Sequence, residues 1–356
     1  MPFINDVLDH NKVRNSVALE TKQASLTQSR FAFEPDQIAT LLLSRIVGQD
    51  HVVESLRQQL NIVKAGLAEP RRPLLVMFML GNTGVGKTEM VRLLAQAIHG
   101  DSNGFCRIDM NTLSQSHYSA AITGAPPGYV GSKENTTLIN QEHIMGSASR
   151  PGIVLFDEVE KASQEVVRSL MNVFDSGKLR LASGTRELSF SNCLVFLTSN
   201  LGAEQWRRQS YKSGWRRWLQ SISHRNRQQC FESALVNHFD PEFLNRIDRV
   251  ELFADIGSDQ VCRIVEMEVT QLAQHLLKKQ VELEVEADVI RQLAIQGFDS
   301  NYGARALRRC VRDQLLAPIA TTLLEVGALV PETKGSTQKC RVRLRGNTIH
   351  CELPAN

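Results

Sequence analysis

Residues 74–88 read LLVMFMLGNTGVGKT, an apolar run that ends in a glycine-rich loop. The loop, Gly81 to Thr88, matches the pattern G-x-x-x-x-G-K-[ST], and a helical pattern follows it from Glu89 to Ile98. A strand, a loop of this composition and a helix in this order are typical of a phosphate-binding loop. A glycine-rich turn with a solvated lysine is the alternative, and the flanking strand and helix argue against it.

Each part of this loop has a physical role in holding a nucleotide. Glycines let successive backbone N–H groups face phosphate oxygens, and the helix N-terminus adds partial positive charge. We expect Lys87 to reach the β- and γ-phosphates of ATP and Thr88 to bind Mg2+. The predicted nucleotide-binding residues of this segment are Gly81, Thr83, Gly84, Val85, Gly86, Lys87, Thr88 and Glu89.

A second apolar strand, Ile153 to Phe156, ends in two adjacent carboxylates, Asp157 and Glu158. The carboxyl ends of parallel strands form the edge at which such sheets bind ligands. We expect Asp157 to hold hydrated Mg2+ and Glu158 to orient and deprotonate the attacking water. A strand running into an acidic helix cap is the alternative, and the phosphate-binding loop upstream favours the catalytic interpretation.

The arrangement of apolar segments predicts an α/β fold. Short apolar runs alternate with helix-like stretches, at 74–80, 106–110, 153–156 and 194–197. This alternation is typical of a parallel sheet with helices on both faces. Two amphipathic helices, near residues 37–45 and 51–64, precede the first run.

The pattern changes after Asp255. Two amphipathic helices, a turn at Gly297 and a long helix from about Ala304 precede two alternating strands that meet at Gly346-Asn347, which predicts a hairpin. We therefore expect a small α+β lid domain at the C-terminus. The predicted division is an N-terminal extension, flexible or an adaptor, at 1–30, a large nucleotide-binding domain at 31–254 and the lid at 255–356.

Bulk composition limits the class of protein. The chain has 356 residues, 42% of them hydrophobic, which is enough to bury a sizeable core. A net charge of +3 is too small to indicate nucleic-acid binding by itself. The seven cysteines are scattered without a C-x-x-C pair, so neither a zinc site nor a disulfide framework is indicated. We expect a cytoplasmic protein.

Further segments resemble the AAA+ ATPases of the Clp type, specifically the second ATPase module of the ClpB disaggregases, from about Arg45 to the C-terminus. The matching segments are IVGQ at 46–49 (adenine side), GAPPGYVG at 124–131 (substrate-gripping pore loop), TSN at 198–200 (first sensor), PEFLNRID at 241–248 (arginine finger) and GAR at 303–305 (second sensor). The resemblance implies the AAA+ variant of the P-loop NTPase fold, ATP hydrolysis with Mg2+, and a homo-hexameric ring.

The resemblance also implies roles for single residues. Val47 and Gly48 would lie beside the adenine, and Asn200 would help to position the water near the γ-phosphate. Arg246 would reach the nucleotide of a neighbouring subunit, and Arg305 would contact phosphate from the lid. As alternatives, Asn200 caps the next helix and either arginine forms only a surface ion pair.

Tyr129 is the expected motor element. It lies in the segment Gly128, Tyr129, Val130, Gly131, and an aromatic side chain on a glycine-flanked loop can grip a polypeptide without sequence specificity. Without the resemblance this segment would be read as a turn. Residues 175–190 resemble a second pore-facing hairpin, although that match is looser.

Two departures from the family pattern limit the expected function. The given sequence has one phosphate-binding loop and no segment of the coiled-coil middle-domain type, so we expect no double ring. The Ile-Gly-Phe or Ile-Gly-Leu loop that docks a peptidase is absent, and Ser213-Gly214-Trp215 stands in the corresponding region. We expect no ClpP-type protease partner.

Residues 205–229 contain seven Arg or Lys residues, no acidic residue and all three tryptophans. Such a run can bind an acidic partner, nucleic acid or a membrane surface. A helix whose tryptophans pack inward and whose arginines are solvated is the favoured interpretation.

These patterns together predict a ring-forming ATP hydrolase that remodels, unfolds or threads a protein substrate through a central pore. The alternative is an AAA+ assembly factor or nucleotide-dependent switch that binds a partner without threading it, and such a partner can be associated with nucleic acid. A torsin-like ATPase that needs an activator's arginine is a third interpretation, and Arg246 argues against it.

Overall fold

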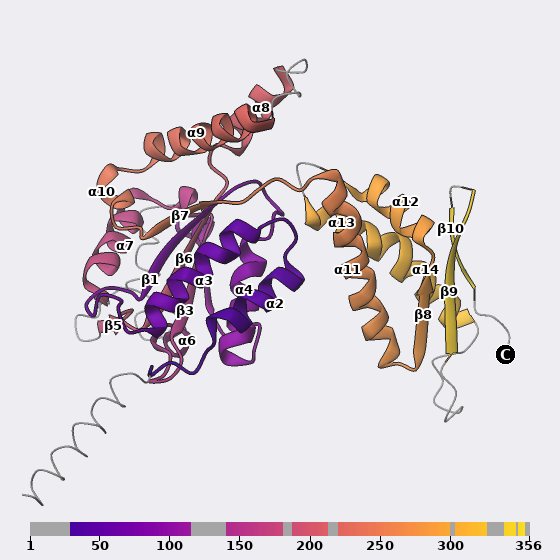
Figure 1. The fold of residues 1–356 in the computed structure, drawn as a ribbon, viewed down its shortest axis with the longest axis horizontal. Coiled ribbons are helices and arrows are strands. Elements are labelled where there is room, and N and C mark those ends of the chain that lie inside the picture. Colours follow the sequence, from indigo (N-terminus) through magenta and orange to yellow (C-terminus); the bar gives the residue numbers. More distant parts are fainter. Residues whose placement is uncertain are drawn as a thin grey trace, which may run out of the picture.

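The computed structural model has two parts joined by one short linker, as Figure 1 shows. It describes residues 29–114, 140–180, 187–212, 220–299, 303–325, 338–346 and 348–352. The predicted extension at 1–30 therefore lies almost wholly outside the described residues, and so does the pore-loop segment at 124–131. Within the described part of the chain, no helix combines the length and apolarity needed to cross a bilayer.

A five-stranded parallel sheet forms the centre of the first part, with strand order β2-β3-β6-β1-β7. The four predicted strands are confirmed, and β7 is a fifth that its mixed composition concealed. The strands are β1 (Leu75–Leu80), β2 (Cys106–Asp109), β3 (Gly152–Asp157), β6 (Cys193–Ser199) and β7 (Arg249–Leu252).

Helices cover both faces of this sheet, as the α/β prediction requires (Figure 1). Successive residues of β1 point to opposite faces of the sheet: Phe78 packs into one apolar core and Met79 into the other. Neither is exposed to solvent. A strand that is buried on both faces must be apolar throughout, which explains its continuous hydrophobic run. The main helices on the two faces are α2 (Pro35–Arg45), α3 (Asp50–Lys64), α4 (Lys87–His99), α7 (Gln164–Ser176) and α9 (Gln220–His238).

Shorter elements complete the first part. The segment predicted as a second hairpin contains two antiparallel strands, and the arginine-finger segment contains a one-turn helix. These elements are η1 (Met110–Leu113), α6 (Gln141–Met145), η3 (Val159–Lys161), β4 (Lys178–Arg180), β5 (Glu187–Ser189), α8 (Ala203–Lys212) and α10 (Pro241–Leu244).

The second part is the small α+β domain, with its own apolar core and a sheet of order β10-β9-β8. The predicted hairpin is present, with Gly346 at φ +65° in its turn. Strand β8 was not predicted. It follows α11 and precedes α12 in the chain, and it pairs parallel to β9. The elements are α11 (Ser258–Leu277), β8 (Val281–Val285), α12 (Ala287–Gly297), α13 (Ala304–Val311), η4 (Arg312–Leu316), α14 (Ala317–Glu325), β9 (Gln338–Arg345) and β10 (Thr348–Glu352).

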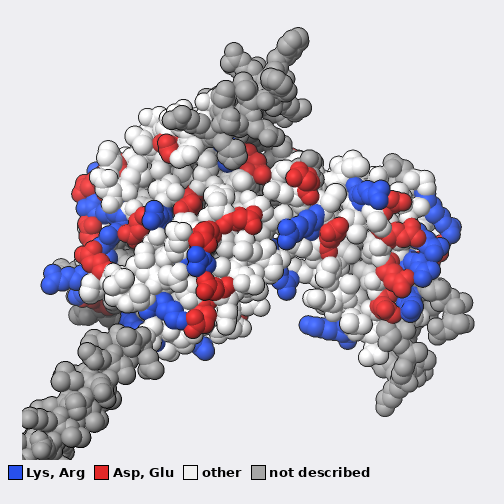
Figure 2. Space-filling view, in the orientation of Figure 1, with Lys and Arg blue, Asp and Glu red and all other residues white. Residues whose placement is uncertain are grey.

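Charged side chains are mixed over the surface. On the face drawn in Figure 2, acidic and basic residues are interspersed over both parts of the molecule. On β9 this mixing is regular, because each cation pairs with an anion on an adjacent strand or, for Glu286, directly after it. The pairs are Lys339–Glu282, Arg341–Glu284, Arg343–Glu286 and Arg345–Glu352.

Candidate nucleotide-binding and hydrolysis site

The glycine-rich loop joins β1 to α4 at the carboxyl edge of the sheet. Gly81, Gly84 and Gly86 all have positive φ, at +142°, +77° and +106°. Such angles favour glycine, and they let the loop turn its backbone N–H groups toward one point. A side chain at Gly81 would also be crowded, since a Cβ there would lie 3.0 Å from Cβ of Phe253.

Lys87 is buried at the centre of this loop. Its Nζ donates to the carbonyl oxygens of Gly81 (2.5 Å) and Asn82 (3.0 Å) and to Oδ1 of Asn200 (2.8 Å). Burial lowers the pKa of Lys87 to about 8, and the nearby carboxylates Glu160 and Asp157 oppose that effect. An added phosphate would supply the negative charge that favours the ammonium form.

Asp157, at the end of β3, is held on both oxygens. Oδ2 accepts two hydrogen bonds from the guanidinium of Arg107, at 3.0 Å and 2.6 Å. Oδ1 accepts from the hydroxyl of Thr198 at 2.5 Å. Arg107 lies on β2, where every second residue is exposed, and its alternating charged pattern was the signal that could have pointed to it.

Glu158 adopts a strained backbone conformation. Its φ of +58° lies in the left-handed region, which a residue with a side chain enters at a cost of about 1–3 kcal/mol. Its backbone N–H donates to Oγ1 of Thr198 at 3.0 Å. The backbone reverses here, and Glu158 lines the same cavity as Lys87.

Asn200 follows β6 and joins two parts of the site. Its backbone N–H donates to Oε1 of Glu160, and its side-chain oxygen accepts from Lys87. The bond that starts the following helix instead runs from the N–H of Ala203 to the carbonyl of Asn200. The side chain of Asn200 therefore faces the lysine, and the helix-cap alternative is not the one observed.

The adenine-side segment lies where the first part meets the lid. Val47 lines the cavity, and Gly48 has φ +77°. A Cβ on Gly48 would lie 2.5 Å from the amide end of the Gln260 side chain on α11, so a larger residue would have to displace that side chain. Gln49, which is fully buried, exchanges two hydrogen bonds with the backbone of Ala254, at 3.0 Å and 2.8 Å.

The lid closes the cavity from the other side. Arg305, on α13, lines it together with Arg308. The N–H of Ala304 donates to the carbonyl of Gly84 at 3.1 Å, so the lid touches the phosphate-binding loop directly. Gly303 (φ +53°) makes this approach possible, because a Cβ there would lie 2.9 Å from the same carbonyl.

Arg246 does not line this cavity. Its guanidinium forms ion pairs with Asp175 (2.6 Å) and Glu242 (2.9 Å), and its side chain is 20% exposed. Its NH1 also donates to the carbonyl of Glu242 at 2.7 Å. In the single chain Arg246 therefore forms the ion pairs that the alternative interpretation predicted, and it lies outside the chain's own nucleotide cavity.

The cavity between the first part and the lid has a size and a lining that suit a magnesium nucleotide. The cavity has a volume of about 770 Å3, within the usual range for ligand pockets. Lys87 and Arg305 give it cations for phosphates, and Arg308, which also lines it, is paired with Glu268. Thr88 and Asp157 offer hydroxyl and carboxylate oxygens, the ligand type that Mg2+ prefers.

The basic stretch at 205–229 is only partly described. Trp206 packs against the large apolar core, and Arg227 is buried and paired with Asp255. Trp206 agrees with the favoured interpretation of inward-packed tryptophans, whereas the buried Arg227 contradicts the expectation of solvated arginines. Arg227 itself is not a solvated arginine, and its burial was missed because its partner lies 28 residues further along the chain.

Comparison with known proteins agrees with this geometry. Residues 72–250 match the family model described as AAA domain (Cdc48 subfamily), and residues 256–334 match the C-terminal, D2-small domain of ClpB protein. The fold and the site define a nucleotide-binding P-loop ATPase. The chain belongs to the AAA family of ATPases, with a small domain of the ClpB type, and it is an ATP hydrolase.

Two similar proteins match almost end to end. The ATP-dependent protease ATP-binding subunit-like protein AmiB of Pseudomonas aeruginosa is 47% identical over 345 residues, which cover 91% of this chain and 93% of that protein. An ATP-dependent protease ATP-binding subunit-like protein of Rhodococcus erythropolis is 40% identical, with 92% and 93% covered. The chain and these relatives therefore have closely similar lengths.

The likeness to disaggregases covers part of longer chains. Chaperone protein ClpB of Dichelobacter nodosus is 35% identical over 297 residues, which cover 83% of this chain and 33% of that protein. A solved structure described as a closed-state reconstruction of Hsp104 with ATPγS and FITC casein has a TM-score of 0.72 at 26% identity, covering 90% of this chain and 51% of that one. This chain thus spans about a third of the ClpB relative.

Proposed function

We propose that the chain assembles into a ring, of six subunits as the family resemblance implies, and couples ATP hydrolysis to unfolding or threading of a protein substrate through a central pore. The position of Arg246 carries this proposal. An arginine that is oriented by two carboxylates, yet lies away from its own nucleotide cavity, can serve a nucleotide only on a second subunit. Such a contact joins unlike surfaces and closes into a ring or winds into a spiral.

Within one subunit we assign the hydrolysis roles from the contacts described above. Lys87 binds phosphate oxygens, Thr88 and Asp157 hold Mg2+, and Glu158 orients and deprotonates the attacking water. When bound there, Mg2+ would supply positive charge beside the phosphates. Asn200 positions Lys87 and the water, because its oxygen already accepts from Nζ.

The lid supplies the coupling to motion. Arg305 faces the cavity from α13, and the backbone of Ala304 bonds to the loop that binds the phosphates. Loss of the γ-phosphate would remove a ligand of Arg305 and change the angle between the two parts. In a ring, a change of this angle moves the next subunit.

A protein substrate is favoured over a nucleic acid. The solved structure with a similar fold was determined with casein, and the relatives of similar sequence are described as chaperones or as subunits related to a protease. Nucleic-acid or membrane contact through residues 205–229, a cytoplasmic location and the lack of a ClpP-type protease partner all stay predictions.

Tyr129 separates a threading motor from a nucleotide-dependent switch. We expect Tyr129→Ala to abolish ATP-dependent unfolding of a fluorescent model substrate while leaving ATP hydrolysis within about twofold of wild type. Tyr129→Phe, which keeps the aromatic ring, should retain unfolding. Full unfolding activity in Tyr129→Ala would contradict threading by this loop and favour the assembly-factor or switch alternative.

A further inference from the structure

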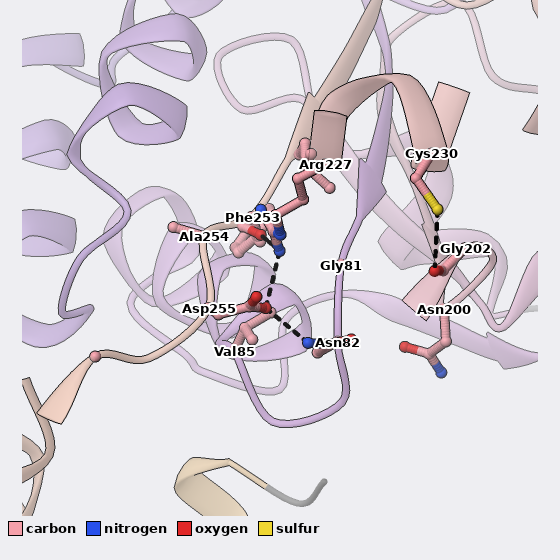
Figure 3. A network of polar contacts seen from close by, with 12 residues as sticks. Gly81, Asn82, Val85, Asn200, Gly202, Arg227, Cys230, Phe253, Ala254 and Asp255 are labelled. Atoms are coloured by element: carbon pink, nitrogen blue, oxygen red, sulfur yellow. Dashed lines mark hydrogen bonds and ion pairs between the residues drawn. The ribbon is translucent and has the colours of Figure 1, made fainter. Parts of the chain in front are cut away.

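The linker between the two parts is tied to the phosphate-binding loop by a carboxylate. Oδ1 of Asp255 accepts hydrogen bonds from Nδ2 of Asn82, at 2.6 Å, and from NH2 of Arg227, at 2.9 Å (Figure 3). The three side chains come from the loop, the linker and α9. One oxygen atom therefore connects three segments that are far apart in the sequence.

Arg227 is an unusual partner because it is buried. Its side chain is 7% exposed, whereas that of Asp255 is 42% exposed. The guanidinium also donates to the carbonyl of Phe253 at 2.8 Å and lies 5.1 Å from the ring of Phe231. A buried guanidinium needs a countercharge, so Asp255 is held in place by the cost of leaving Arg227 unpaired.

Asn82 passes this constraint to the nucleotide site. It is the second residue of the phosphate-binding loop, and it is 9% exposed. Its carbonyl oxygen accepts from Nζ of Lys87, while its side chain donates to Asp255. A displacement of Asp255 would therefore move the same peptide that orients the phosphate-binding lysine.

The neighbouring linker residues are clamped as well. The N–H of Phe253 donates to the carbonyl of Leu80, and Ala254 exchanges two hydrogen bonds with Gln49. Phe253 and Ala254 are therefore held to the large domain by their backbone, and Asp255 by its side chain. We expect a swing of the lid to pivot after Asp255, at residues 256–257, before α11 begins.

We propose that Arg227 and Asp255 are positioning residues of the ATPase site: they fix the first half of the phosphate-binding loop and so slow nucleotide release. The proposal rests on the nucleotide cavity of a single chain and not on ring assembly or threading. Arg227 acts through Asp255, and Asp255 acts through Asn82.

The test is nucleotide release from purified protein, measured with a fluorescent ADP analogue in Mg2+ buffer. We expect Arg227→Met to raise the release rate and the Kd about tenfold, because a charged hydrogen bond to the linker is lost. Arg227→Lys, which keeps the charge, should recover much of the affinity. Arg208→Met is the matched control: Arg208 is exposed and pairs with Glu204 on α8, and its loss should leave the Kd within about twofold.

A double-mutant cycle separates positioning from general stability. If Asn82 transmits the effect, Asn82→Ala and Arg227→Met should be non-additive in Kd, and Asp255→Asn should weaken binding at a thermal midpoint near that of wild type. The proposal is overturned if folded Arg227→Met binds within twofold of wild type, or if the two changes add fully. It is also overturned if the weaker binding of the ADP analogue by Asp255→Asn is fully explained by a smaller fraction of folded protein. All of these outcomes are independent of threading, which the Tyr129 variants address.

Discussion

The hydroxyl of Thr198 lies 2.5 Å from Oδ1 of Asp157 and accepts a hydrogen bond from the backbone N–H of Glu158. One fully buried side chain thus orients the predicted metal ligand and also holds the strained backbone of the predicted base. Thr198 lies on β6, two residues before Asn200, and β6 pairs with β3 in the sheet. The register of these two strands therefore places the hydroxyl between the carboxylate of Asp157 and the backbone N–H of Glu158.

Replacing this hydroxyl should separate chemistry from binding. Thr198→Val has nearly the same shape but loses both hydrogen bonds, so Glu158 is no longer held at its positive φ. We expect kcat for ATP hydrolysis to fall about tenfold or more, with a change in KM below about threefold. Steady-state kinetics check this, and Thr198→Ser, which keeps the hydroxyl, should stay close to wild type. An unchanged kcat in Thr198→Val would contradict the assigned role of the hydroxyl.

Contact between the lid and the phosphate-binding loop should depend on Gly303. In Gly303→Ala the new Cβ would lie 2.9 Å from the carbonyl of Gly84 and 3.0 Å from that of Thr83, so the lid must move away. We expect KM for ATP to rise about threefold or more, since Arg305 moves with the lid. Steady-state kinetics measure this change.

Gly346→Ala is the matched control for that experiment. Gly346 also has positive φ, at +65°, and a Cβ there would meet nothing within 4 Å. This change should lower the thermal midpoint and leave KM unchanged. An equal rise of KM in both variants would show that backbone strain, and not contact with the loop, is the cause.

Stability of the lid should depend on pH through Glu284. A hydrogen bond from Arg341 lowers the pKa of Glu284 below its ordinary value of 4.5. A carboxyl group whose pKa is lower in the folded chain stabilises the fold above its unfolded pKa, and this contribution is lost as the pH falls through the folded value. The thermal midpoint of Glu284→Gln should therefore lie below that of wild type at pH 7, and the difference should shrink at pH values below 4.5.

The partner of Glu284 provides the control. Arg341→Gln removes the same ion pair from the other strand, so its midpoint should converge with that of wild type over the same pH range. The pair is partly exposed, and we expect a small effect that also weakens at high salt. A difference that is constant from pH 7 to pH 3 would contradict the assignment.

Local sequence signals were enough to predict most of the fold. The strand before the glycine-rich loop is buried on both faces, so its apolar run is continuous and easy to recognise. The loop itself is defined by residues next to one another in the chain. Strands β7 and β8 were missed because RVEL and VELEV are short and half polar. Their pairing with β1 and β9 decides their conformation, and pairing partners are distant in sequence.

The same distinction applies to the site. Lys87, Asp157 and Glu158 could be predicted because each belongs to a motif of adjacent residues. Arg227 could not, because it acts through a carboxylate 28 residues further along the chain. Arg107 acts through a carboxylate 50 residues further along, and only the alternating pattern of β2 could have pointed to it. Arg227 also lies in a basic run that was read as solvated, and only the three-dimensional structure shows that it is buried.

The ring proposal is tested most directly by sharing one active site between two subunits. ATPase activity would be measured against protein concentration for wild type, for Arg246→Ala and for a one-to-one mixture of Arg246→Ala with Glu158→Gln. In mixed rings an intact Glu158 of one subunit faces an intact Arg246 of its neighbour. We expect a cooperative rise for wild type, loss of activity in Arg246→Ala and partial recovery in the mixture. Activity that is independent of both concentration and Arg246 would contradict the shared site and leave a self-contained switch.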